Sequence, residues 1–322
     1  MLSERFKWDG KSSLKLSKRQ IEAKRRVEDE TESILSSYRF ENYLCECGAG
    51  EEYFETLAEK DRYGFKVKTV ICRKCGLMMT NPRMTQDSYN MFYDLEYGKL
   101  YRDQDQDIID DSYFSNKVLT GKYIYNFVRN HSDVEFNEVL EIGCAAGGIL
   151  QYFKDMGCNV TGCDLGSTYI EWGKEKGLNL LKCNSYELLK YDKKYDLIIL
   201  NHVFEHFLDI EKEVDVISKL LSANGILYIA VPGVKALTYT YNRDLMLYLQ
   251  NAHVRHFTLR TLESVMNRYG FGLSVGNEEV QAIFKYTGIK RCNPHNYYVD
   301  TMKFLFELED EYEKNMGYMN RN

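Results

Sequence analysis

Short apolar runs recur through the middle of the chain, and most of them end at a glycine or a polar residue. They lie at 138–142, 159–164, 178–183, 196–200 and 226–231. Runs of this length, rich in Val, Ile and Leu, are typical of buried strands in a parallel sheet. The helical stretches between them are expected to cover the sheet. The pattern therefore predicts an α/β fold with a mostly parallel sheet.

Other stretches extend this prediction on both sides. Apolar spacing predicts a helix over 115–131, a last strand over 280–286 and an amphipathic helix over 297–316. The long segment 234–257 is expected to be partly helical and to cover the carboxyl edge of the sheet, where such segments usually shape a binding site.

Capping residues set the limits of two further helices. Ser167 is expected to cap one helix, which ends at Gly177. Gly225 is expected to close another helix in a left-handed turn. A strand follows each of these glycines, as the α/β pattern requires.

The first apolar run leads into a glycine turn. Gly143 follows the run directly, and Gly147 and Gly148 precede the next helical stretch. A turn without side chains lets the backbone approach a ligand, and the helix N-terminus offers free N–H groups. At the carboxyl edge of a parallel sheet, such a turn predicts a nucleotide site. Ala145 stands where the dinucleotide pattern has a glycine, which weakens a phosphate-binding role.

The second apolar run ends in an acidic residue. Asp164 lies 17 residues after Gly147. This spacing is close to that at which a strand-end carboxylate accepts hydrogen bonds from ribose hydroxyls. The two strand ends together predict a site for a nucleoside.

Titratable residues follow the fourth apolar run. Their order, His202-x-x-Glu205-His206, is also the zinc pattern of inverted zinc peptidases. That alternative would leave the glycine turn and Asp164 without a role. Imidazoles near their unperturbed pKa suit general acid–base chemistry, and Glu205 could orient one of them or act as the base.

Four of the nine cysteines form two close pairs near the N-terminus. They are Cys45–Cys47 and Cys72–Cys75, and a glycine follows each pair. Four thiolates on two turns predict a closed, structural zinc site, although the first pair has one residue fewer between its cysteines than is usual. Such a site has no open position for catalysis, so its expected role is to stabilise a small module.

Composition narrows the classes of function. The 322 residues are 44% hydrophobic and 28% charged, with a net charge of −6. This balance gives no general attraction to nucleic acid. No apolar run approaches the ~20 residues that span a bilayer, and the N-terminus lacks a signal-peptide core. We therefore expect a cytoplasmic protein with no membrane span.

The first 40 residues form a charged arm. Up to Arg26 this arm holds nine Lys and Arg against three Asp and Glu, a local balance of +6. Its apolar residues recur about once per two helical turns, which favours a solvated or partner-packed helix. The alternative is that the basic residues of this arm bind an anionic acceptor or a membrane surface.

The glycine turn resembles the first motif of class I S-adenosylmethionine (SAM) methyltransferases, in which a strand and an acidic residue precede G-x-[GA]-x-G. The run "HVFEHFLDI" from His202 and the segment 251–258 resemble later parts of the same family. The resemblance implies a Rossmann-like methyltransferase sheet with its last strand antiparallel, and SAM as cofactor. The residues expected to contact SAM are Glu141, Gly143, Cys144, Ala145, Gly147, Asp164, Leu165, Asn184, Ser185 and Asn201. The catalytic candidates are His202, Glu205 and His206, followed by His253 and His256.

Residues 72–83 and 89–93 resemble the N-terminal zinc-binding module of a methyltransferase subgroup that accompanies sugar-nucleotide and surface-polysaccharide biosynthesis. The resemblance implies a structural Zn²⁺ on the four cysteines and a small, sugar-linked acceptor. Only 47 residues follow Val275. They look too few for the further C-terminal lobe of the sugar C-methyltransferases, which favours O-methylation over the C- and N-methylation that also fit.

The expected organisation has several parts. They are a basic helical arm (1–40), a zinc-binding module (41–93), a linker (94–114), a SAM-binding domain (115–290) with a covering insertion (234–257), and a C-terminal helix (291–322). A catalytically silent SAM-binding or scaffold subunit is the alternative from another class, but the acceptor-side histidines favour an enzyme. The sequence also allows a homodimer.

Overall fold

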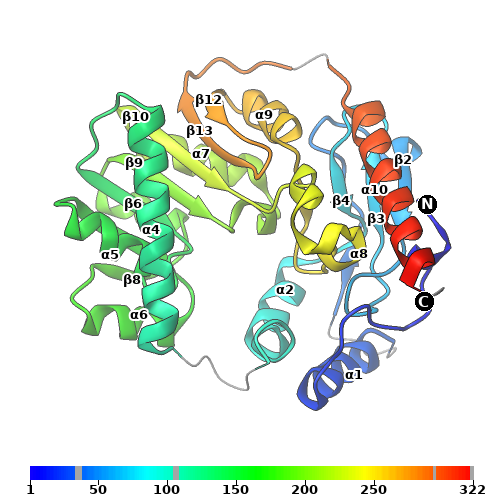
Figure 1. Cartoon of the computed structure of the whole chain (residues 1–322). Helices are drawn as coiled ribbons and strands as arrows, with labels where there is room; N and C mark the ends of the chain where they lie inside the picture. Colours follow the sequence, from blue (N-terminus) through cyan, green and yellow to red (C-terminus); the bar gives the residue numbers. More distant parts are fainter. Residues whose placement is uncertain (33–37, 104–108, 293–294, 320–322) are drawn as a thin grey trace. The chain divides into compact units, whose positions relative to one another are not determined.

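The chain folds into two compact units, each built from separate stretches of sequence (Figure 1). The computed structural model describes residues 1–32, 38–103, 109–292 and 295–319. The sheet unit comprises Asp107–Val231 and Leu262–Asn293. The cysteine unit comprises Met1–Gln106, Pro232–Thr261 and Pro294–Asn322.

The sheet unit contains a seven-stranded sheet in the order β12-β13-β10-β9-β6-β7-β8. Its strands are β6 (Glu138–Ile142), β7 (Asn159–Asp164), β8 (Leu180–Lys182), β9 (Tyr195–Asn201), β10 (Leu221–Ala230), β12 (Phe271–Gly276) and β13 (Gln281–Tyr286). β13 pairs antiparallel with both β10 and β12, and the other pairings are parallel. The prediction of a mostly parallel sheet with an antiparallel last strand is thus confirmed.

The strand order reverses between β6 and β9. From β6 the chain moves to β7 and β8 on one side, whereas from β9 it moves to β10 on the other. Because such crossovers are right-handed, their helices lie on opposite faces of the sheet. A crevice forms beyond the carboxyl ends of the strands at such a reversal, where α/β proteins bind ligands. Here the crevice lies between the ends of β6 and β9.

Five helices accompany this sheet within the described residues. They are α4 (Asp111–His131), α5 (Gly148–Asp155), α6 (Ser167–Glu175), α7 (Ile210–Leu220) and α9 (Leu259–Arg268), whose first turn belongs to the cysteine unit. Short 3-10 helices are η4 (Tyr186–Tyr191) and η5 (Phe204–His206). The Asp110 carboxylate caps α4 by accepting the Tyr113 N–H at 2.7 Å. A Cβ on Gly121 would lie 2.5 Å from the Ile149 oxygen, so glycine permits the close packing of α4 on α5.

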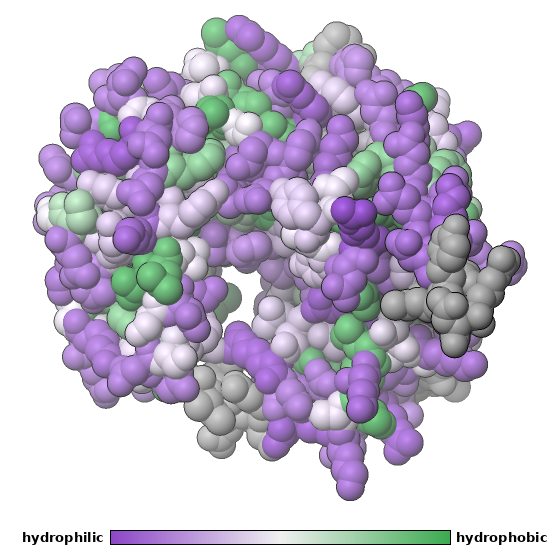
Figure 2. All heavy atoms as spheres, viewed as in Figure 1, coloured by the Kyte–Doolittle hydropathy of each residue, from purple (hydrophilic) through white to green (hydrophobic). Residues whose placement is uncertain are grey.

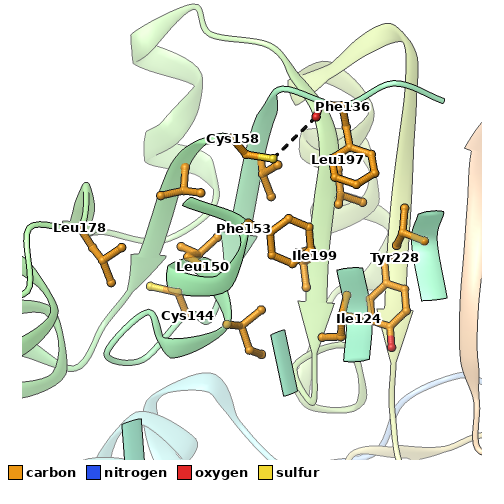
Figure 3. Close-up of a cluster of buried hydrophobic side chains, with 14 of the residues drawn as sticks. Ile124, Phe136, Cys144, Leu150, Phe153, Cys158, Leu178, Leu197, Ile199 and Tyr228 are labelled. Carbon is orange, nitrogen blue, oxygen red and sulfur yellow. Dashed lines mark hydrogen bonds between the residues drawn. The ribbon is translucent and has the colours of Figure 1, made fainter. Parts of the chain in front are cut away.

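One hydrophobic core joins α4, α5 and α6 to a face of the sheet. Figure 3 shows Phe153 and Leu150 of α5 between the strand residues Leu197 and Ile199 and the neighbouring Cys144 and Leu178. Cys158 closes one end of this cluster, where its thiol donates to the Phe136 carbonyl at 3.8 Å. The strands and helices that carry the crevice are therefore held by a continuous apolar core.

The cysteine unit contains two small antiparallel sheets. The larger has the order β11-β4-β3-β2, and in the smaller β1 pairs with β5. The strands are β1 (Phe40–Glu41), β2 (Phe54–Ala58), β3 (Thr69–Cys72), β4 (Met78–Thr80), β5 (Arg83–Met84) and β11 (Arg255–His256). The helices are η1 (Glu4–Phe6), α1 (Lys18–Glu32), η2 (Glu51–Tyr53), α2 (Gln86–Phe92), the π-helical turn η3 (Tyr93–Tyr97), α3 (Gly98–Tyr101), η6 (Lys235–Thr238), η7 (Tyr241–Arg243), α8 (Leu245–Tyr248) and α10 (Tyr298–Met319).

A second core holds the three stretches of the cysteine unit together. It contains Phe6, Leu57, Met246 and Tyr248 with Leu305 of α10, among others. The Arg5 guanidinium joins the same stretches through polar contacts, because it binds the carboxylates of Asp244 at 2.8 Å and Glu309 at 2.5 Å. The C-terminal helix is therefore part of this unit.

Several local predictions need correction. Residues 1–40 do not form one helix, because only η1 and α1 are helical within their described part, and α1 buries Ala23 and Val27. The basic residues of this stretch are also partly neutralised, as in the ion pair of Arg26 with Glu96 at 2.8 Å. Ser167 is the first residue of α6, and Gly166 takes the N-cap position.

Gly225 does not close a helix. α7 ends at Leu220, and the extended Leu221 already begins β10. A Cβ on Gly225 would lie 2.8 Å from the Tyr195 oxygen, so this glycine permits close approach to β9 at the start of the strand.

The segment 234–257 is partly helical, as predicted, but its last part adds a strand to the cysteine unit. β11 pairs with β4, which satisfies backbone groups on an otherwise open edge. The prediction that this segment belongs to the SAM-binding domain is therefore wrong, because Pro232–Thr261 is part of the cysteine unit.

The surface agrees with the composition. Figure 2 shows a face on which hydrophilic side chains dominate and hydrophobic ones form only small patches. Among the helices of the described residues, none is both long and apolar enough to cross a membrane.

Candidate SAM-binding and catalytic site

The glycine turn after β6 has the backbone conformation that its sequence suggested. Gly143, Ala145 and Gly147 have positive φ angles of 73°, 45° and 76°. The N–H groups of Gly143 and Cys144 both donate to the Cys163 carbonyl, at 2.8 and 3.1 Å, which fixes the turn against β7. Gly147 then forms the N-cap of α5. The turn is thus a rigid cradle at the carboxyl end of β6.

The Asp164 carboxylate supports this turn. Its Oδ2 accepts the Ala145 N–H at 2.9 Å, and its Oδ1 accepts the Gly166 N–H at 2.8 Å. The first bond holds the left-handed conformation of Ala145, which is uncommon for a residue with a side chain. Each oxygen keeps a second lone pair, so the carboxylate can still accept hydrogen bonds from a ligand.

A pocket opens beside the turn. It is lined by Tyr113, Lys117, Glu141, Gly143, Cys144, Ala145, Ala146, Gly148, Ile149 and Asn201. Five residues predicted to contact SAM are among the lining: Glu141, Gly143, Cys144, Ala145 and Asn201.

The buried carboxylate of Glu141 faces this pocket. Glu141 is 2% exposed, and its Oε2 has no hydrogen-bond partner among the described residues. Burial raises the pKa of this carboxyl well above its usual value, while the Lys117 cation opposes the rise and Asp164 adds to it. A buried, incompletely paired acid is costly unless a ligand supplies a donor or a positive charge. SAM carries both an ammonium and a sulfonium, so the pocket fits this cofactor.

The end of β9 forms the other side of the crevice. Asn201 lines the pocket, and His202 has a φ of 57° and donates its N–H to the Ala230 carbonyl at 2.8 Å. Val203 lies against the glycine turn, because a Cβ on Gly143 would be 2.5 Å from its Cγ2. The residues after β9 therefore adjoin the predicted cofactor site directly.

Glu205 lies between two imidazoles. Its Oε1 is 3.6 Å from Nδ1 of His202 and 3.8 Å from Nε2 of His206. The carboxylate is 2% exposed, whereas the side chain of His202 is 56% exposed. A buried acid can orient a neighbouring imidazole and stabilise its protonated form.

The zinc-peptidase alternative does not fit this segment. Its two histidines would have to lie one turn apart on a helix. Here η5 includes only Phe204–His206, and His202 is outside it with a left-handed backbone.

Five residues predicted to contact SAM lie outside the pocket lining: Gly147 and Asp164, described above, and Leu165, Asn184 and Ser185. Leu165 follows β7 and is 66% exposed, as a residue available for ligand contact would be. The Asn184 side chain accepts the Glu187 N–H in the first turn of η4 at 3.1 Å, and the Ser185 hydroxyl donates to Glu213 at 2.6 Å. Both polar side chains already have partners within the protein.

The cysteines near the site are protonated thiols. Burial raises the pKa of Cys144 well above its ordinary value. Contact with Cys183, together with burial, raises the pKa of Cys163. Neither side chain has the thiolate character of a nucleophile.

The four N-terminal cysteines come together in the cysteine unit. Their sulfur atoms all lie within 4.8 Å of one another, with Cys45 and Cys75 at 3.4 Å and Cys47 and Cys72 at 3.6 Å. Sulfurs at the corners of a tetrahedron around zinc, with bonds of 2.3 Å, are about 3.8 Å apart. The donor set and its spacing therefore fit a zinc ion.

The two cysteine turns share one design despite their different lengths. The Gly48 N–H donates to the Cys45 carbonyl at 2.7 Å, and the Gly76 N–H donates to the Cys72 carbonyl at 2.8 Å. Both glycines have a positive φ, of 82° and 80°. The hydrogen bond that closes the first turn spans one residue fewer than that of the second turn. The two thiols of the C-x-C pair can therefore still face the thiols of the second pair. We call these turns the first knuckle (45–49) and the second knuckle (72–77).

The remaining catalytic candidates, His253 and His256, belong to the cysteine unit. Both are buried. Neither ring nitrogen of His256 has a hydrogen-bond partner among the described residues, and burial lowers its pKa to about 3. A base with this pKa accepts a proton poorly near neutral pH, which disfavours His256 as the catalytic base.

The pocket also contains two residues that the sequence analysis did not select. Tyr113 and Lys117 reach it from α4, which precedes the glycine turn in sequence. Gly148 is the one sequence feature that points to this approach of α4. Because Gly148 lacks a Cβ, Lys117 can come within contact distance of α5.

The reversal between β6 and β9, the glycine turn and the acid at the end of β7 define the class I methyltransferase fold. A family model described as "Methyltransferase domain" matches residues 120–273. The "Ubiquinone biosynthesis O-methyltransferase" of Rickettsia canadensis (strain McKiel) is 26% identical over 208 residues, 62% of this chain and 84% of that protein. The protein of the same description from Pelagibacter ubique (strain HTCC1062) is 34% identical over 109 residues, 32% of this chain and 45% of its own length.

Among solved structures, a SAM-dependent methyltransferase from Archaeoglobus fulgidus is similar at 21% identity, with a TM-score of 0.40, over 48% of this chain and 69% of that one. At this identity and TM-score, the structural similarity carries no argument about function. The matched domain and the named relatives show that the chain is an enzyme, a SAM-dependent methyltransferase.

Proposed function

We propose that this enzyme transfers the methyl group of SAM to a hydroxyl of a small, sugar-linked acceptor in glycan biosynthesis. The observation that carries the proposal is the group of His202, Glu205 and His206, which follows β9 directly beside the glycine turn. Imidazoles at this place can take the proton that a hydroxyl must lose. The O-methyltransferase names of the relatives support transfer to oxygen.

The proposed cofactor contacts follow the charges of the pocket. Glu141 and Asp164 would attract the cationic groups and ribose hydroxyls of SAM, and Lys117, which also lines the pocket, would pair with its carboxylate. Gly143, Ala145 and Gly147 would let the backbone approach it, and Asn201 would meet it from β9. When bound, SAM supplies a methyl group on a positively charged sulfur.

The chain's residues would then align and deprotonate the acceptor. Transfer is an in-line displacement, in which the acceptor oxygen bonds to the methyl carbon as the carbon–sulfur bond breaks and its electron pair stays on sulfur. Holding the two groups in line can contribute several kcal/mol. His202 or His206 would accept the hydroxyl proton, and the Glu205 carboxylate would stabilise the resulting imidazolium.

The sugar-linked acceptor rests on the cysteine module, which resembles that of sugar-modifying methyltransferases. A hydroxyl on an aromatic ring is the second candidate, because the curated relatives are named for ubiquinone biosynthesis. We further propose that Cys45, Cys47, Cys72 and Cys75 hold a structural zinc ion.

Labelled SAM tests the proposal when the enzyme is offered nucleotide sugars and, separately, a catechol. Label in a sugar hydroxyl supports it, label only in the catechol selects the second candidate, and label in neither contradicts both. His206→Asn should lower kcat about 100-fold with little change in SAM affinity, because it removes proton transfer alone. His131→Asn, at an exposed histidine of α4, is the control.

A further inference from the structure

Both knuckles are linked to the same short segment of the cysteine unit, residues 250–257. The second knuckle leads directly into β4, which pairs with β11 through Arg255↔Met79 and His256↔Met78. The Thr80 N–H extends this pairing by donating to the Val254 carbonyl at 3.0 Å. The segment that contains His253 and His256 is therefore bonded to one half of the cysteine site through its backbone.

The first knuckle reaches the same segment through side chains. Glu46, the residue between Cys45 and Cys47, forms an ion pair with Arg255. The side chain of Arg255 is 2% exposed and that of Glu46 is 10% exposed, so this pair is nearly buried. Tyr43, two residues before Cys45, donates its hydroxyl to the Val254 carbonyl at 3.1 Å, and the Arg255 guanidinium lies 5.4 Å from the centre of its ring.

These contacts make a clamp whose two arms meet at the four sulfurs. The sulfur contacts run between the knuckles, since Cys45 meets Cys75 and Cys47 meets Cys72. An ion bound by the four cysteines would connect the first knuckle, which contains Glu46, to the second knuckle, which continues into β4. A nearly buried ion pair is costly to form but sensitive to exact position, so it transmits displacement of the knuckle to Arg255.

We propose that Glu46 and Arg255 are positioning residues, through which the four-cysteine site holds segment 250–257 for acceptor binding and leaves SAM binding unaffected. This inference rests on the proposed function together with the expectation from the sequence that segment 234–257 shapes the acceptor site. The cysteine site then has a role in the reaction in addition to stabilising a module.

The test compares variants that separate charge from packing. Glu46→Gln breaks the ion pair and leaves one buried charge, which can destabilise the fold. The double variant Glu46→Met/Arg255→Met replaces the pair by apolar side chains of similar size, a change that folds usually tolerate. Glu41→Gln is the control, because it breaks a more exposed ion pair, that with Arg83 at 2.9 Å, in the same unit.

Amide hydrogen exchange is the first measurement, on the full chain with its metal content determined. In the double variant we expect exchange in 250–257 to be about tenfold faster, with exchange in β6 and β7, zinc content and SAM affinity within about twofold of wild type. Removing the metal from the wild-type protein with a chelator should accelerate exchange in the same segment. Unchanged exchange in 250–257 in both experiments overturns the proposal.

Kinetics test the link to the acceptor. The acceptor KM should rise at least about fivefold in the double variant while kcat changes less. Faster exchange with an unchanged KM overturns the acceptor role. If the wild-type protein methylates neither kind of acceptor, the proposed function fails, and the exchange result still decides whether Glu46 and Arg255 position the segment.

Discussion

A Cβ atom on Gly143 would lie 2.5 Å from Cγ2 of Val203. Gly143 begins the turn after β6 and Val203 follows β9, so this contact joins the two sides of the crevice. Glycine is required at position 143 for two reasons. A Cβ would clash with Val203, and the φ of 73° is unfavourable for a residue with a side chain.

Gly143→Ala is therefore expected to lower both stability and SAM affinity. The left-handed backbone should cost about 1–2 kcal/mol before the clash is counted. Adding Val203→Ala removes the clashing methyl groups and should restore part of the melting temperature. Calorimetry of both variants with and without SAM checks this, and equal melting temperatures for the single and double variants would contradict the contact.

Asp164→Asn should weaken SAM binding at least about tenfold. An asparagine has one acceptor oxygen, so its NH₂ group would face either the Ala145 N–H or the Gly166 N–H that the carboxylate now accepts. Titration calorimetry measures the affinity. Asp155→Asn, at an exposed site on α5, is the matched control, and an equal loss there would point to a general charge effect.

The cysteine site should contain about one zinc ion per chain, because four closely spaced thiols make a complete tetrahedral ligand set. Cys75→Ser should lose most of this zinc and lower the melting temperature of the cysteine unit. Cys292→Ser, at an exposed cysteine of the sheet unit, should change neither. Metal analysis of protein purified without chelators checks the stoichiometry. A metal-free wild-type protein would contradict the assignment.

His256→Phe should change how stability depends on pH. The pKa of His256 is lowered from 6.5 in the unfolded chain to about 3 in the fold. The contribution of the neutral ring is thus fully present above pH 6.5 and is lost as pH falls toward 3, because only the unfolded state gains the proton.

When the pH is lowered from 8 to 5, the free energy of unfolding of the variant should rise by about 2 kcal/mol relative to that of wild type. This follows from about 1.36 kcal/mol for each of the roughly 1.5 pH units between 6.5 and 5. Urea unfolding at both pH values measures this difference. His131→Gln, at an exposed histidine, should show no such gain. A pH-independent difference for His256→Phe would mean that the ring is accessible to protons in the folded protein.

The sheet and the glycine turn could be predicted because their signals are local. A buried parallel strand is apolar on both faces, and the turn after β6 needs glycine where φ is positive, so both leave a direct mark on the sequence. The four cysteines could likewise be predicted as metal ligands from their spacing in the sequence. Gly225 was misread because close approach between strands and a helix cap both call for glycine.

The non-local features left no such mark. The pairing of β11 with β4 and the docking of α10 beside Leu57 depend on contacts between residues far apart in sequence. Lys117 enters the pocket only because α4 packs closely on α5. The backbone of His202 shows in the same way that a histidine spacing alone does not make a helix.

The interleaved course of the chain also sets an order for biosynthesis. During translation the four cysteines emerge before Arg255, and Arg255 emerges before α10, yet all three belong to one unit. The sheet unit is likewise interrupted, since β12 and β13 follow the insertion. Neither unit can complete its core until the last quarter of the chain has left the ribosome. The four thiols are therefore made well before Arg255 and α10, the parts of the chain that complete their unit.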